Sequence, residues 1–105
     1  MPHSLIYVTF GSEENAKEVA KSLVEERLVS CANIFPAIQS IYSRDDKVQE
    51  DQEIVVIFKT RSGLFSKVEE HIKQLHTYET PCIIAIQIEN GSAKFLEWID
   101  KETAN

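Results

Sequence analysis

The chain has 105 residues, enough for one two-layer core, so we expect a single domain over residues 1–105. Its apolar fraction of 43% and charged fraction of 27% are ordinary for a soluble globular protein. The net charge of -6 argues against nucleic acid and anionic membranes as partners, and no apolar run approaches the ~20 residues that span a bilayer.

The first predicted strand is LIYVTF at residues 5–10, a short apolar run rich in β-branched and aromatic residues, which Gly11 ends. Ser12 suits the N-cap of a following helix, because Glu13 and Glu14 then lie in the first turn, where the helix dipole favours negative charge. The apolar residues of this helix share one face: Ala16, Val19, Ala20, Leu23 and Val24.

The middle of the chain predicts two long strands. The first is SCANIFPAIQSIY at 30–42, in which Pro36 indicates an edge strand or a bulge, because proline cannot donate to a ladder. The second is EIVVIFKT at 53–60, which is apolar enough to be buried on both faces. Between them, the highly charged segment 43–52 is expected to be a connection.

The last third predicts a helix, a strand and a final helix. Ser62 suits the cap of the first helix, whose apolar face is formed by Phe65, Val68, Ile72 and Leu75. CIIAIQI at 82–88 predicts the fourth strand, a turn follows at 90–91, and SAKFLEWIDK at 92–101 predicts the last helix.

The resulting order is β-α-β-β-α-β-α, which indicates an α+β, ferredoxin-like fold with an extra C-terminal helix. Such a fold has one antiparallel sheet with its helices on one face. The uncovered face would still carry large apolar residues, and an exposed apolar face of that size usually marks an interface. We therefore expect an oligomer.

The strand directions of this fold predict which residues lie at each end of the sheet. The end of the first strand, the charged segment 43–52, His76 and Cys82 share one end. Cys31, Lys59 and Thr60 lie at the other. Because the long second strand rises ~3.3 Å per residue, Cys31 and His76 are expected to meet only across a subunit boundary.

The stretch HTYETPC at residues 76–82 is the densest group of metal-binding residue types. His76, Glu79 and Cys82 offer nitrogen, oxygen and sulfur donors, which suit copper or zinc. An equally simple interpretation is structural: His76 favours a helix C-terminus, Pro81 stops the helix, and the cysteines are buried and inert. Composition alone favours the structural interpretation.

No enzyme template is present, because the sequence lacks G-x-S-x-G, Walker A and H-E-x-x-H motifs. We therefore expect a protein that is not an enzyme and has no obligatory cofactor. Two cysteines are too few for a disulfide scaffold, which favours a reducing, cytoplasmic compartment.

Four segments resemble one known family over nearly the whole chain, from about residue 5 to residue 100. They are LVSCANIFPAIQSIY, EIVVIFKT, HTYETPCII and FLEWI, and together they are similar to the CutA family of divalent-ion tolerance proteins. The resemblance implies a ferredoxin-like subunit in a heat-stable homotrimer. The family is also similar in fold and assembly to the PII signalling proteins, which bind small ligands in subunit clefts.

The resemblance also implies a site between subunits. The residues expected to line its cleft are Cys31, Tyr42, Lys59, Thr60 and Tyr78. The expected metal ligands are His76, Glu79 and Cys82, with Cu(II) or another divalent ion as the partner. The alternative is a PII-like signalling or scaffold trimer that binds a small anionic metabolite through Lys59, Thr60 and the helix N-terminus at Ser12.

Overall fold

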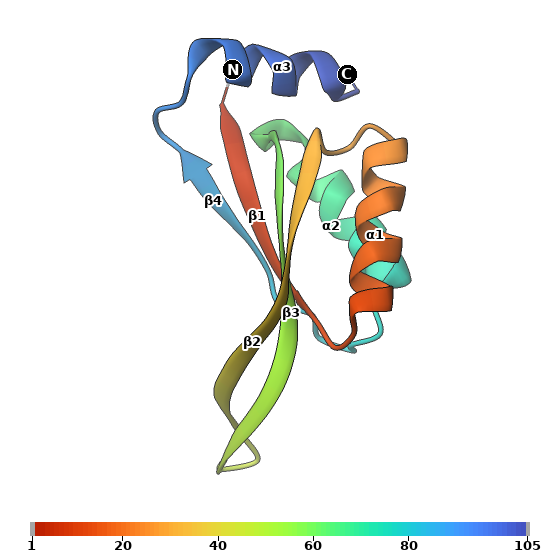
Figure 1. The fold of residues 1–105 in the computed structure, drawn as a ribbon, viewed down its shortest axis with the longest axis vertical. Helices are drawn as coiled ribbons and strands as arrows, with labels where there is room; N and C mark the ends of the chain where they lie inside the picture. The colour runs from red at the N-terminus through yellow and green to blue at the C-terminus, as the bar shows by residue number, and fades with distance from the viewer. Residues whose placement is uncertain (1, 105) are drawn as a thin grey trace.

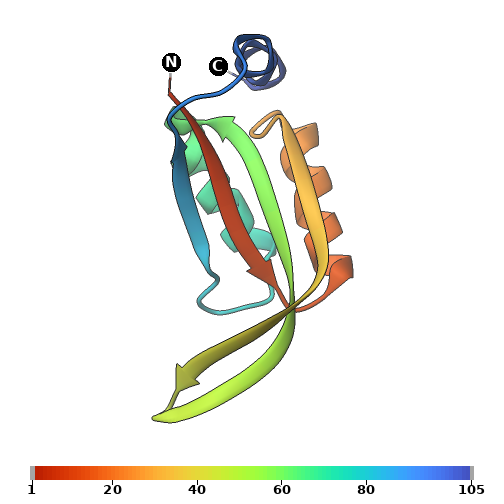
Figure 2. The same ribbon diagram turned by 60° about the vertical axis from the view of Figure 1, so that its left-hand side comes forward.

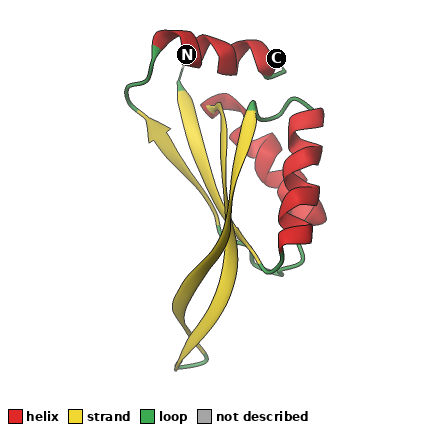
Figure 3. Ribbon diagram, in the orientation of Figure 1, coloured by secondary structure: helices red, strands yellow, loops and turns green. Residues whose placement is uncertain are grey.

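The computed structural model describes residues 2–104. These residues form four strands and three α-helices, and a short 3₁₀ turn at Ser62–Leu64 precedes α2. Figure 1 and Figure 3 show how these elements are arranged. The elements are β1 (His3–Phe10), α1 (Glu13–Glu25), β2 (Cys31–Arg44), β3 (Lys47–Arg61), α2 (Phe65–Leu75), β4 (Ile83–Ile88) and α3 (Ala93–Glu102).

The four strands form one antiparallel sheet in the order β2-β3-β1-β4. Helices α1 and α2 pack side by side on one face of the sheet, and α3 crosses one end (Figure 2). This is the ferredoxin-like arrangement with an added C-terminal helix, so the predicted fold class is confirmed.

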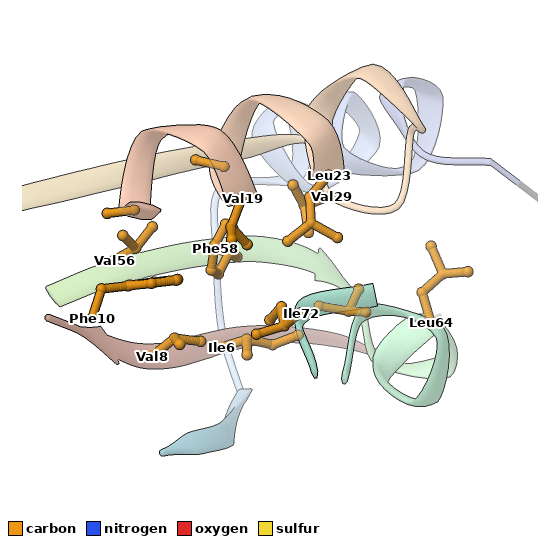
Figure 4. Close-up of a cluster of buried hydrophobic side chains, with 13 residues drawn as sticks. Ile6, Val8, Phe10, Val19, Leu23, Val29, Val56, Phe58, Leu64 and Ile72 are labelled. Atoms are coloured by element: carbon orange, nitrogen blue, oxygen red, sulfur yellow. The ribbon is translucent and has the colours of Figure 1, made fainter. Parts of the chain in front are cut away.

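The core lies between the sheet and the two packed helices (Figure 4). Alternate residues of the two central strands point into it, as the two-residue period of a strand requires. The helices contribute the apolar positions that recur every three or four residues. Members that are completely buried include Ile6, Val8, Phe10, Val19, Leu23, Val56, Phe58, Val68 and Ile72.

Helix α1 begins and ends with standard capping contacts. The Ser12 hydroxyl accepts a hydrogen bond from the Asn15 N–H at 3.1 Å, which confirms the predicted N-cap. At the other end Arg27 has a φ of 58°, and the N–H of Leu28 donates to the Leu23 carbonyl at 3.0 Å. This is a Schellman ending in which arginine takes the left-handed position that glycine usually occupies.

Helix α2 does not use the predicted cap. The Ser62 hydroxyl is hydrogen-bonded to the Ser4 hydroxyl on β1 at 2.5 Å, and Leu64 precedes the helix without any side-chain cap. The 3₁₀ turn Ser62–Leu64 leads directly into the helix instead. The prediction was wrong because Ser62 follows β3 so closely that its hydroxyl meets a neighbouring strand.

The charged segment 43–52 is not a connection. Strands β2 and β3 continue through it and pair residue by residue up to Arg44 and Lys47, forming a long hairpin arm (residues 38–53) that leaves the body of the molecule (Figure 1). The turn consists of Asp45 and Asp46, both with positive φ, as a two-residue type I′ turn requires. Cross-strand pairing thus outweighs the low strand preference of charged residues.

The arm provides a stability prediction. Asp46 has a φ of 62°, and glycine adopts this conformation without the steric cost that a side chain carries. We expect Asp46→Gly to raise the free energy of unfolding by about 0.5–1 kcal/mol, measured by urea denaturation at fixed protein concentration. A loss of stability in this variant would contradict the assigned turn.

The bulge predicted at Pro36 is present. The register between β2 and β3 shifts between Phe35 and Ile38, and β2 is an edge strand of the sheet. Both parts of the sequence-based alternative, an edge strand or a bulge, are therefore confirmed, because proline leaves no N–H for a ladder at this point.

One face of the sheet is uncovered in the described chain, and we call it the open face. Tyr7 lies opposite Ile57 and Ile84, and Leu5 lies opposite Ile86, all on the side away from the helices. Ile84 and Ile86 are 53% and 52% exposed. The prediction that the fold leaves an apolar face bare is confirmed.

Candidate functional site

A cleft of about 660 Å³ lies where the hairpin arm leaves the body. Its walls come from the arm, from the end of β1 and from the loop between α2 and β4. The lining residues are Thr9, Tyr42, Arg44, Asp51, Glu53, Tyr78, Glu79, Thr80 and Cys82. Its volume is within the range of about 300–1,000 Å³ that ligand pockets commonly have.

The cleft is acidic. Asp51 and Glu53 lie two residues apart on β3, so their side chains leave the same face of the strand. Glu79 adds a third carboxylate, and Arg44, whose guanidinium lies 5.5 Å from the centre of the Tyr42 ring, is the one cation in the lining. The Tyr42 hydroxyl donates to Asp51, which raises the pKa of this phenol. Such a surface attracts cations.

His76 points inward and has both ring nitrogens occupied. Its Nδ1 accepts the Tyr78 N–H at 3.0 Å, so Nε2 carries the proton and donates to the Thr9 carbonyl at 2.7 Å. The imidazole stacks on Phe10 with ring centres 4.6 Å apart. Burial lowers the pKa of His76, which keeps the ring neutral. A metal bound to His76 would have to displace one of these hydrogen bonds.

Tyr78 crosses the loop and reaches β3. Its hydroxyl donates to Glu53 Oε2 at 2.8 Å. A Cβ at Gly11 would lie 3.1 Å from the Tyr78 ring and hydroxyl, so glycine leaves the room that this side chain needs. Burial, followed by the bond to Glu53, raises the pKa of Tyr78 to about 12.

This contact predicts an alkaline transition. The pKa of Tyr78 is about 12 in the folded state and 10 in the unfolded state. The protonated phenol therefore contributes its full stabilisation below pH 10, and this stabilisation is lost as the pH rises towards about 12. We expect Glu53→Gln to lower the pKa of Tyr78 part of the way from about 12 towards 10, because it removes the carboxylate that accepts the hydrogen bond while burial of the phenol remains. Ultraviolet absorbance of the phenolate measures this, and equal titrations in both proteins would contradict it.

The residues predicted as metal ligands do not form a complete ligand set in one chain. Within residues 2–104, no group of three or more His, Cys, Asp or Glu side chains is close enough to hold a metal ion. Glu79 and Cys82 line the cleft, whereas His76 is turned away from it. Burial, and then the charge of Glu53, raises the pKa of the Cys82 thiol. A cation here needs further donors.

Three of the residues predicted to line the cleft lie at the opposite end of the sheet. Cys31 pairs with Lys59 across β2 and β3, and the Lys59 ammonium lies 5.3 Å from the Phe95 ring centre. Thr60 is completely buried and donates its hydroxyl to the Leu28 carbonyl at 2.7 Å. The predicted separation of the two ends is confirmed, but Thr60 is not surface-lining in this chain.

Tyr42 and Tyr78 do lie together in the cleft, as expected. The sequence interpretation missed Asp51 and Arg44, because it assigned their segment to a connection. It also missed Glu53, which it placed in a buried strand. The alternation of the arm residues between the two faces of a strand was the signal that could have found them.

Comparison with known proteins identifies the family. The profile described as CutA1 divalent ion tolerance protein matches residues 4–102, nearly the whole chain. A divalent-cation tolerance protein CutA from Archaeoglobus fulgidus is 46% identical over 99 residues, covering 94% of this chain and 96% of the relative. The chain belongs to the CutA1 divalent ion tolerance family.

Solved CutA structures share the fold of this CutA1-family chain. The CutA1 structure from Oryza sativa has a TM-score of 0.96 at 40% identity, with 99% of this chain and 95% of that chain covered. The divalent cation tolerance protein from Thermus thermophilus has a TM-score of 0.95 at 41% identity, with 97% and 99% covered. The antiparallel α+β architecture is therefore that of the family.

The CutA relatives differ in length and in location. The match with the chloroplastic CutA protein of Arabidopsis thaliana spans all 105 residues of this chain at 42% identity, but only 58% of the length of that relative. The Archaeoglobus structure is described as periplasmic. Within residues 2–104 no helix is long and apolar enough to cross a membrane. The relatives are named as tolerance proteins rather than as enzymes.

Proposed function

We propose that this CutA1-family chain is a divalent-cation tolerance protein that assembles as a homotrimer. In this proposal it binds the cation, copper first, at subunit boundaries. The observation that carries the proposal is the acidic cleft at the base of the arm, where Glu53, Glu79 and Cys82 present oxygen and sulfur donors. Cu(II) is the strongest test ion, because it stands highest in the Irving–Williams order.

Two features support a site that is completed between subunits. The first is that the cleft donors do not form a group of three within residues 2–104. The second is the open face, whose exposed isoleucines Ile84 and Ile86 need cover from another chain. A trimer covers this face and brings further donors to each cleft. The role is binding, without an obligatory cofactor.

The alternative of an anionic metabolite has less support. It requires Lys59, Thr60 and Ser12 to act together, but Lys59 and Thr60 lie at the end of the sheet opposite to Ser12. Thr60 is also buried. The cleft itself carries three carboxylates against one guanidinium and therefore repels anions.

We also propose that the protein works in a reducing, cytoplasmic compartment, because Cys31 and Cys82 are both free thiols.

Calorimetric titration of the metal-free protein with Cu(II) and Zn(II) tests the proposal. We expect binding that Glu53→Gln and Cys82→Ser each weaken by about tenfold or more, as loss of a donor to a charged ligand does. Glu70→Gln is the matched control, because it removes the same charge from the exposed surface of α2. Equal affinity in all four proteins would overturn the assigned site.

A further inference from the structure

His76 holds the loop from His76 to Cys82 in place, because its two ring nitrogens bond to two different segments of the chain. Nε2 of His76 donates to the Thr9 carbonyl at the end of β1, at 2.7 Å. Nδ1 accepts the N–H of Tyr78 at 3.0 Å, two residues later in the chain. A side-chain acceptor bonded to the N–H two positions on is the geometry by which asparagine and aspartate shape turns.

The surroundings of His76 and Tyr78 restrict their positions further. The imidazole stacks on Phe10 at an interplanar angle of 13°, so its plane is set by a residue of the core. The rings of His76 and Tyr78 are 4.8 Å apart. The Tyr78 ring also lies close to Gly11, where a Cβ would come within 3.1 Å of it. The phenol is therefore directed towards β3.

The phenol ends on a carboxylate of the cleft. Tyr78 donates to Glu53 Oε2 at 2.8 Å, so one carboxylate oxygen has a fixed protein partner. The other oxygen stays available for a cation, since each carboxylate oxygen carries its own lone pairs. A contact of this kind holds the ligand in place, as hydrogen bonds to metal-binding carboxylates do in known sites.

We propose that His76 is a positioning residue of the cleft, which sets Tyr78 and, through the Tyr78 hydroxyl, orients Glu53 for the cation. This inference rests on the proposed function, because it assigns Glu53 to cation binding. It replaces the ligand role that the sequence suggested for His76 with an indirect one. The Nδ1 contact carries the effect, and the Nε2 contact anchors the ring to β1.

Two substitutions test the roles of the two ring nitrogens of His76 separately. In His76→Asn the amide oxygen takes the place of Nδ1 and can accept the Tyr78 N–H, but nothing reaches Thr9. In His76→Gln the amide nitrogen reaches towards the Thr9 carbonyl, but the Nδ1 acceptor is lost. We therefore expect His76→Asn to preserve the positioning of Tyr78, whereas His76→Gln and His76→Ala abolish it.

The first readout needs no cation. Amide hydrogen exchange followed by NMR reports whether the Tyr78 N–H is bonded. We expect its protection to be near wild type in His76→Asn and to fall by at least tenfold in His76→Gln and His76→Ala. Equal loss in the asparagine and glutamine variants would overturn the positioning role. This readout stands even when no cation binds, so its outcome is distinct from failure of the proposed function.

The second readout is Cu(II) affinity by calorimetry. Positioning predicts that His76→Asn binds within about twofold of wild type and that His76→Gln binds about tenfold more weakly. We expect Tyr78→Phe to keep the backbone amide of residue 78 protected. We expect it to bind Cu(II) about tenfold more weakly, because it removes the hydroxyl that bonds to Glu53. If His76 were itself a ligand, His76→Asn would bind as weakly as His76→Ala, and that result would overturn the proposal.

Discussion

Replacing Ile84 and Ile86 together by aspartate is expected to convert the proposed homotrimer into single chains. Both side chains lie on the open face and are more than half exposed in one chain, so the change has little effect on the isolated fold. In an assembly it buries two unpaired charges, each of which costs several kcal/mol. Sedimentation velocity at micromolar concentration measures the loss.

A matched control places two aspartates on the helix-covered side. Ser66 and Gln74 are exposed on α2, and their double substitution adds the same charge without touching the open face. We expect this control to sediment like the parent. An unchanged assembly in the isoleucine variant would show that the open face is not the interface.

Phe58→Ala is expected to cost about 3–5 kcal/mol of folding free energy, the usual range for removing a buried phenylalanine. Phe58 is completely buried on β3, the strand that pairs with both β1 and β2. Removal of its ring leaves a cavity between the sheet and α1 (Figure 4). The surrounding side chains are already closely packed and cannot move far enough to fill it.

Denaturant unfolding at a fixed protein concentration measures this cost, because the stability of the proposed homotrimer depends on protein concentration. Lys67→Ala on the exposed surface of α2 is the control and should stay within about 0.5 kcal/mol of the parent. A cost below about 1 kcal/mol for Phe58→Ala would contradict its place in the core.

Helices and strands whose apolar residues recur at a regular spacing were predictable from the sequence. Helix α1 shows this well, because Ser12 and the apolar positions from Ala16 to Leu23 define both its start and its buried face. The arm was not predictable in this way. Its residues are mostly polar, and its turn uses Asp45 and Asp46 where the familiar signal is asparagine followed by glycine.

The end of the sheet at which His76 and Cys82 lie was predictable, but the direction of the His76 side chain was not. Strand directions alone placed His76 and Cys82 at the end of the sheet opposite to Cys31, as the structure has them. The inward direction of His76 could not be predicted, because it depends on a hydrogen bond to the backbone carbonyl of Thr9, a residue 67 positions away in sequence. Composition shows which donors are present, not where their lone pairs point.

The bulge at Pro36 has a consequence for the single chain in solution. Strand β2 lies at the sheet edge, and long flat edges of this kind template aggregation. The register shift between Phe35 and Ile38 divides this edge into two short runs with different alignment. A misplaced strand from another protein can therefore pair with only one run, which protects the single chain and its exposed apolar residues from aggregation.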